Sequence, residues 1–142
     1  MTPTVQTAPQ IAQGAVALVK KKFGFQLRYD PPSLIVIDML VDKIKETGAS
    51  EHQASGFLLG LGCYVGEVFV RHARASWRAT AEMGMTRTCA YPILLALRGT
   101  VTCDAIGIVF RRFADGAAQS AAALYETSVL RAPQGVPEKG PA

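Results

Sequence analysis

The apolar residues of the N-terminal half recur at the three- and four-residue spacing of amphipathic helices. The first predicted helix covers residues 9–22 and ends in three lysines before Gly24, which suits the negative end of a helix dipole. The second follows residues 30–33, where an N-cap side chain and first-turn prolines precede the apolar positions, and it ends at Gly48. These predictions rest on Ile11, Ala15, Leu18, Val19, Leu34, Ile37, Leu40, Val41 and Ile44.

A third helix, from about residue 50 to residue 73, is expected at the centre of the fold. Ser50 and Gln53 form the Ser-x-x-Gln pattern of a capping box, which predicts where this helix begins. Its core stripe consists of Phe57, Leu61, Tyr64, Val65 and Val68. The same segment holds Gly56, Gly60, Gly62 and Gly66. Because each glycine inside a helix costs about 0.8 to 1 kcal/mol relative to alanine, four of them indicate that another backbone passes very close.

After Trp77 the pattern changes to short apolar runs. Residues 76–80 and 91–97, separated by the turn-prone residues 83–85, predict a small antiparallel hairpin or meander. Thr102 and Asp104 are capping candidates for a fourth helix that ends at Gly116, and residues 117–129 predict a fifth. The predicted fold class is therefore α+β and mostly helical: four or five helices surround the helix at about 50–73, with a small antiparallel sheet of two or three strands.

Both ends of the chain are expected to be disordered tails. Residues 1–8 are rich in Thr, Pro and Gln, and residues 131–142 contain several prolines and glycines, so neither segment buries enough apolar surface to offset its ordering. The remaining residues, 9–130, are predicted to form a single globular domain. A chain of 142 residues that is 49% hydrophobic is long enough to bury such a core without disulfides or a metal.

The cysteine pattern and the hydropathy predict a cytoplasmic protein. Three cysteines at scattered positions, without CxxC spacing, indicate free thiols in a reducing compartment. The longest apolar run, residues 54–70, is shorter than the roughly 18 to 20 residues that a membrane span needs, and it contains Glu67, so no membrane association is expected. The net charge of +4 is a mild excess that falls short of a dedicated nucleic-acid binder.

One ordered set of residues resembles a known family. Gly62, Tyr64, Gly66 and Glu67 form a G-x-Y-x-G-E pattern; then come Trp77, Tyr91, Pro92, Ile93, residues 104–111 and Gly116. In this order the chain resembles a family of small uncharacterised bacterial proteins, a domain of unknown function, whose helix precedes a Trp-bearing strand, a short second strand and a helical pair. The resemblance covers about residues 33–125. The chain departs from the family pattern at residues 79–88, because this segment between the two strands is longer than expected. It implies an α+β fold and, since the family has no assigned activity, no mechanism.

Cysteine and histidine do not combine into a nucleophilic pair in this pattern. Cys63 and His72 lie on opposite faces of one predicted helix and roughly 13 Å apart along it, far beyond the about 3 Å that a nucleophile and its base need. His52 shares a face with Cys63 but lies about 16 Å away along the same axis. Cys63 is therefore interpreted as a small buried thiol.

Glu67 is the acidic residue that most needs an explanation, since it stands on an otherwise apolar helix. It precedes Arg71 by one turn, the favourable order for an ion pair. One interpretation makes it a general base in a cleft beside Tyr64, and the other makes it a structural carboxylate bonded to Arg71, Trp77 or backbone amides. The second is favoured because no nucleophile or metal-ligand set accompanies it. The candidate binding residues are therefore Tyr64, Glu67, Arg71 and Trp77, with no catalytic residue, metal site or cofactor predicted.

Three functions remain open from the sequence. The leading hypothesis is a non-enzymatic cytoplasmic interaction or binding module, whose partner is an unknown protein or a second copy of the chain. The first alternative is an enzyme or small-ligand-binding protein that uses a cleft near Glu67 and Tyr64. The second alternative is a weak anion or nucleic-acid binder that uses Arg71, Arg74 and Arg78, although aromatic residues do not interleave with these arginines as in RNA-binding patterns.

Overall fold

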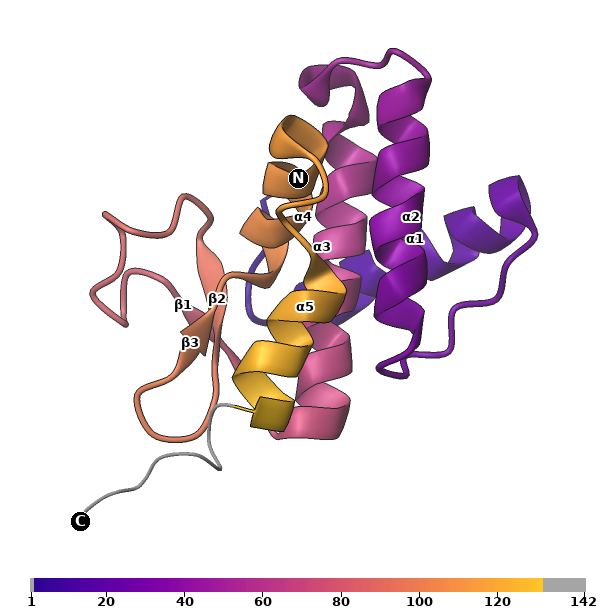
Figure 1. The fold of residues 1–142 in the computed structure, drawn as a ribbon. Coiled ribbons are helices and arrows are strands. Elements are labelled where there is room, and N and C mark those ends of the chain that lie inside the picture. Colours follow the sequence, from indigo (N-terminus) through magenta and orange to yellow (C-terminus); the bar gives the residue numbers. More distant parts are fainter. Residues whose placement is uncertain (1, 132–142) are drawn as a thin grey trace.

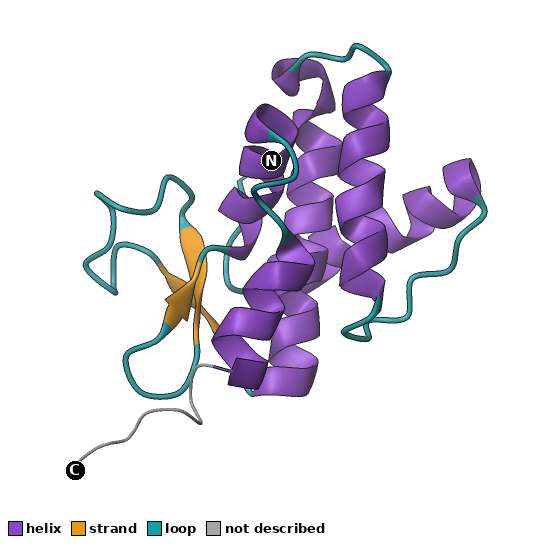
Figure 2. Cartoon of the chain, viewed as in Figure 1, coloured by secondary structure: helices purple, strands orange, loops and turns teal. Residues whose placement is uncertain are grey.

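The computed structural model describes residues 2–131 and confirms an α+β fold that is mostly helical (Figures 1 and 2). The elements in chain order are α1 (Ala8–Phe23), α2 (Ser33–Glu46), α3 (Glu51–Ala73), β1 (Ser76–Ala79), β2 (Ile93–Ala96), β3 (Thr102–Cys103), α4 (Ala105–Asp115), α5 (Ala121–Tyr125) and the π-helix η1 (Glu126–Arg131). In Figure 1 the sheet lies on one side of the helices, and the end of α1 projects on the other. The prediction of a mostly helical α+β fold is thus correct.

Helix α3 lies at the centre, with α1 and α4 in the most extensive contact with it. Its glycines explain how these elements come so close. A Cβ added at Gly60 would lie 3.0 Å from the Cβ of Ala15 in α1, and one added at Gly62 would lie 2.8 Å from the Cα of Ile106 in α4. The predicted close backbone approach is confirmed at these two positions.

The other two glycines of α3 do not meet a backbone. A Cβ at Gly66 would enter the ring of Trp77, so this glycine makes room for an indole. A Cβ at Gly56 would have nothing within 4 Å, so the prediction of a close backbone there is wrong. The physical reason is that Gly56 borders an open groove between α1 and α3.

Local capping residues set the helix boundaries as the sequence predicts. The Ser50 hydroxyl accepts the Gln53 backbone N–H, and the Gln53 side chain accepts the Ser50 N–H, which completes the capping box. The Asp30 carboxylate accepts the N–H of Ser33 at the start of α2. Asp104 accepts the N–H of Gly107 at the start of α4.

The sheet is antiparallel, in the order β1-β2-β3. Trp77 is paired with Leu95, and Leu95 with Cys103, so these three buried residues share one face of the sheet and belong to the core. The hairpin predicted from residues 76–80 and 91–97 is therefore present, and a two-residue third strand extends it.

Two boundaries differ from the sequence-based expectations. Residues 1–8 are expected as a disordered tail, whereas the structure buries Pro3 and Ala8 and links Thr4 to Thr7 by side-chain hydrogen bonds. The fifth helix is expected from residue 117, whereas it begins after Ser120, whose hydroxyl caps it. The expected C-terminal tail falls, apart from Arg131, outside the described residues.

A buried carboxylate holds the start of α5 against α2. Asp38 accepts hydrogen bonds from the Ser120 hydroxyl at 2.7 Å and from the backbone N–H groups of Ala121 and Ala122 at 2.8 and 3.3 Å. Because a buried charge requires such partners, this contact fixes where the helix begins. The apolar periodicity of residues 117–129 does not predict this contact with Asp38.

Helix α3 is long and apolar enough to cross a membrane by length and composition, but 67% of its most apolar stretch is buried inside the protein. It is the core helix, as the sequence predicts, and its burial fits a soluble protein.

Candidate functional site

The carboxylate of Glu67 is buried and partnered. Only 6% of the residue is exposed, and its Oε2 accepts the indole N–H of Trp77 at 2.9 Å. The Nε of Arg71 lies 4.0 Å from Oε1. These contacts match the interpretation of Glu67 as a structural carboxylate, since one oxygen is bonded to an indole and the other faces a guanidinium.

Tyr64 is likewise engaged in holding the chain together. Its hydroxyl accepts the backbone N–H of Tyr29 at 2.8 Å and lies 2.6 Å from the Ser33 hydroxyl. Burial raises the pKa of Tyr64, while the hydrogen bonds from Ser33 and Tyr29 act against that rise. The hydroxyl thus joins α3 to the loop before α2 and to the first residue of α2.

Tyr29 connects the predicted residues to one another. Its backbone has φ 59°, a left-handed conformation uncommon outside glycine, and its carbonyl oxygen lies 2.8 Å from Nε2 of His72. The guanidinium of Arg71 lies over its ring, with Cζ 3.6 Å from the centroid. The sequence analysis missed Tyr29, because its two backbone hydrogen bonds join residues more than thirty positions apart.

The structure therefore brings Tyr64, Glu67, Arg71 and Trp77 into one network of buried and half-buried contacts. Among five pockets found on the described residues, none is lined by Glu67 or Tyr64. The expected cleft beside these two residues is not among them. The network stabilises the junction of α3, β1 and the 24–32 loop.

The three cysteines are buried and free. Burial, assisted by the nearby charge of Glu67, raises the pKa of the Cys63 thiol to about 12. Since the thiolate is the nucleophile, a thiol with such a pKa is unreactive near neutral pH. The interpretation of Cys63 as a small buried side chain agrees with this environment.

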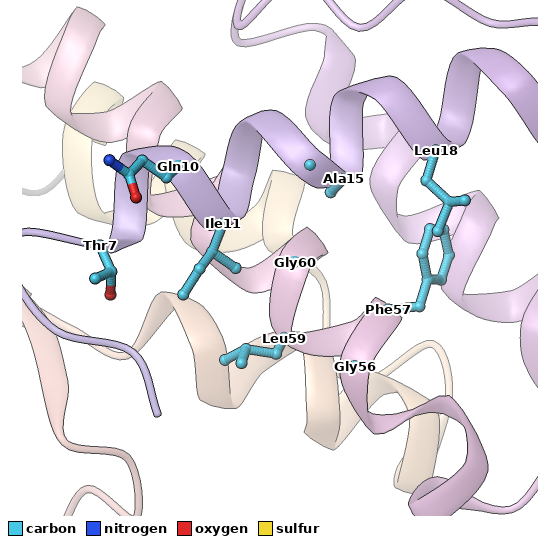
Figure 3. A pocket seen from close by; sticks show the side chains of 10 residues that line it. Thr7, Gln10, Ile11, Ala15, Leu18, Gly56, Phe57, Leu59 and Gly60 are labelled. Atoms are coloured by element: carbon cyan, nitrogen blue, oxygen red, sulfur yellow. The ribbon is translucent and has the colours of Figure 1, made fainter. Parts of the chain in front are cut away.

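An apolar groove of about 440 Å³ runs between α1 and α3 (Figure 3). In Figure 3 the side chains of Ile11 and Leu18 extend from α1 toward Leu59 and Phe57 of α3. All four of these side chains are only partly buried. The complete lining is Thr7, Gln10, Ile11, Gly14, Ala15, Leu18, Gly56, Phe57, Leu59 and Gly60.

Two glycines keep this groove open. A Cβ at Gly14 or at Gly56 would have nothing within 4 Å, in contrast with Gly60 at the base of the same groove. The sequence analysis did not single out Gly14, although a glycine inside an otherwise regular amphipathic helix is the signal that could have found it.

The groove ends beside a basic segment. The ring of Phe57 stacks with that of Phe23 at a centroid distance of 6.3 Å, at the end of α1 where Lys20, Lys21 and Lys22 are exposed. Leu18 lies three and four residues before Lys21 and Lys22, so these lysines continue its face of the helix. The groove thus combines an apolar floor with positive charge at one end.

Within residues 2–131 no group of three or more His, Cys, Asp or Glu side chains is arranged to hold a metal ion. Comparison of the chain with protein-family models, with curated proteins and with solved structures finds no match in any of the three.

Proposed function

We propose that this chain is a non-enzymatic interaction module, and that the groove between α1 and α3 is where it binds a partner protein. The observation that carries the proposal is the pair of glycines on the groove walls. A glycine inside a helix costs about 0.8 to 1 kcal/mol relative to alanine, and neither Gly14 nor Gly56 is required by a neighbouring atom. Stability is commonly given up where function needs a feature that the fold itself does not, and here that feature is the open groove.

The lining of the groove selects the chemistry of the partner. Ile11, Gly14, Leu18 and Lys21 follow one another at three- and four-residue steps, so they form one face of α1. An amphipathic helix suits this face, because it buries apolar side chains against Ile11 and Leu18 at helical spacing. Acidic residues at one end of that helix would lie near the exposed lysines, which gives the complex its orientation.

The compartment and origin belong to the same proposal. Three free, buried cysteines support a cytoplasmic protein. The G-x-Y-x-G-E helix followed by Trp77 supports membership of the bacterial family that the sequence resembles, and the α+β fold is consistent with it.

Selection from a displayed library of random peptides tests the proposal on the purified chain. We expect enriched peptides to have apolar residues at i, i+3 or i+4, and i+7, with Asp or Glu at one end. Gly14→Leu fills the groove and should weaken their binding at least tenfold while the variant melts no lower than wild type. The matched control is Ala17→Leu, an exposed position of the same helix outside the groove, which should bind normally.

Two outcomes would contradict the proposal: enrichment of no helical pattern, or enriched peptides that bind Gly14→Leu as tightly as wild type. Sedimentation of the chain alone over a range of concentrations measures self-association, and so shows whether a second copy of the chain binds in the groove. Self-association that Gly14→Leu abolishes would make a second copy, and not another protein, the partner in the groove.

A further inference from the structure

We propose that a second cavity, at the end of α3, binds a small organic anion that has an apolar body. The cavity has a volume of about 500 Å³, which is in the range of small-molecule sites. Three segments meet there: the last residues of α3, the turn between β2 and β3, and η1. The lining residues are His72, Ala73, Arg74, Leu97, Arg98, Gly99, Thr100, Val101, Ser128 and Val129.

The lining is positively charged and has no carboxylate to balance it. Arg74 and Arg98 both border the cavity, and none of the ten lining residues is Asp or Glu. Within residues 2–131, the arginines found in ion pairs are Arg71, Arg111, Arg112 and Arg131. Two guanidinium groups outside such pairs offer planar donor forks that match a phosphate or carboxylate group.

Hydroxyl groups add further donors. Ser128 accepts a hydrogen bond from the Cys103 thiol, with Sγ and Oγ 3.3 Å apart. This leaves the hydrogen of the Ser128 hydroxyl free to donate to an anion. Thr100, in the turn between β2 and β3, is a second hydroxyl-bearing residue of the lining.

The backbone of Arg74 is an independent observation. Arg74 follows the last residue of α3 with φ 57°, a left-handed conformation that glycine adopts without strain and that is uncommon for other residues. An arginine therefore stands where the fold by itself favours glycine. Such strain persists where the side chain has a use, and here the side chain lines the cavity.

A rare element supplies the other wall. Ser128 and Val129 belong to η1, a π-helical stretch of six residues. π-Helical turns are rare and occur frequently at functional sites. Together with Arg74, this element gives the cavity two unusual backbone segments.

The apolar part of the lining defines the rest of the ligand. Leu97, Val101 and Val129 border the cavity, and Val101 is 38% exposed. A ligand that places its anionic group on the arginines and its body on these side chains would cover that apolar surface. The shared chemistry is therefore a phosphate or carboxylate group attached to an apolar body.

Titration calorimetry with phenyl phosphate, benzoate and inorganic phosphate tests the proposal on the full chain. We expect saturable binding of phenyl phosphate or benzoate, at least fivefold tighter than that of inorganic phosphate. Tighter binding of phenyl phosphate would identify a phosphate ester as the natural ligand, and tighter binding of benzoate a carboxylate. Absence of saturable binding of all three probes, or equal binding of inorganic phosphate, would overturn the proposal.

Three variants distinguish anion binding in this cavity from unspecific anion binding to exposed arginines. Arg74→Gly should weaken binding at least tenfold and raise the melting temperature, because it removes strain and donor together. Arg98→Gln should weaken binding to a similar extent. Arg78→Gln is the matched control, since Arg78 is exposed on β1 and does not line the cavity.

Equal effects of Arg78→Gln and Arg74→Gly would overturn the proposal, and so would full binding by Arg74→Gly. A single-stranded oligonucleotide that binds more tightly than the small probes, with equal losses in all three variants, would replace the site by a nucleic-acid surface.

Discussion

The ring of Trp77 occupies the space that a side chain at residue 66 would need, and Gly66 is the residue that leaves this space empty. The same ring donates its N–H to Glu67, the next residue of α3. Two consecutive residues of α3 therefore determine where β1 meets the helix, one through an absent side chain and the other through a carboxylate.

Gly66 and Gly56 should respond in opposite directions to the same substitution. Gly66→Ala places a methyl group in the Trp77 ring and should destabilise the fold by about 1 to 3 kcal/mol, as overpacking does. Gly56→Ala meets open space in the same helix and should stabilise it by roughly 0.5 to 1 kcal/mol. Urea unfolding of the two variants beside wild type measures both values, and equal signs would contradict the packing described for α3.

Glu67→Gln tests whether the carboxylate is structural. The variant keeps an acceptor for the Trp77 indole but replaces a charge-assisted hydrogen bond by a neutral one, so we expect a loss of about 1 kcal/mol. Glu67→Ala leaves the buried indole N–H unsatisfied and should cost roughly 2 to 3 kcal/mol. Thermal and urea unfolding give the order of the two variants. A Glu67→Gln protein that melts above wild type would show that the charge is held unfavourably, as in a catalytic base.

The Cys63 thiol should make stability depend on alkaline pH. Its pKa rises from 9.0 to about 12 on folding, so the native state keeps a proton that the unfolded state has lost above pH 9. The contribution is fully present below pH 9 and is lost as the pH rises through about 12; over this range it is on the order of 4 kcal/mol. Unfolding of wild type and Cys63→Ala across this range isolates the contribution, since the tyrosines titrate in both. If the free energies of unfolding of the two proteins change with pH in parallel, the Cys63 thiol makes no such contribution.

The two ends of the chain should differ in their effect on stability. Deletion of residues 2–7 removes the buried Pro3 and the Thr4–Thr7 hydrogen bonds in front of α1, and it should lower the melting temperature by several degrees. Deletion of residues 132–142 should leave the melting temperature nearly unchanged. Differential scanning calorimetry of the two truncated chains measures the effects. An N-terminal deletion without loss of stability would restore the expectation of a disordered tail.

The elements that depend on near neighbours in the sequence were predictable. Ser50 and Gln53 lie three residues apart, and their capping box fixes the start of α3 by local hydrogen bonds alone. Helical glycines are equally visible, because their destabilising effect is local and calls for an explanation. The fold class follows from such signals, and the structure confirms it.

The features that could not be predicted from the sequence depend on contacts between residues far apart in the chain. Nothing near Tyr29 indicates that its N–H meets a hydroxyl 35 residues away, or that this contact holds a left-handed backbone. The sequence predicted that something packs on Gly66, but which group does so depends on the register of β1. The groove and the cavity are spaces between elements, so they become visible only when the elements are in place.

The tether between Asp38 and the start of α5 has a consequence for biosynthesis. The carboxylate is translated 82 residues before the Ser120 hydroxyl that it binds. Until then it has no partner from α5 and has to remain hydrated. A chain released by premature termination before residue 120 would carry an unpartnered charge and uncovered apolar surface, the features by which chaperones and proteases sort incomplete products.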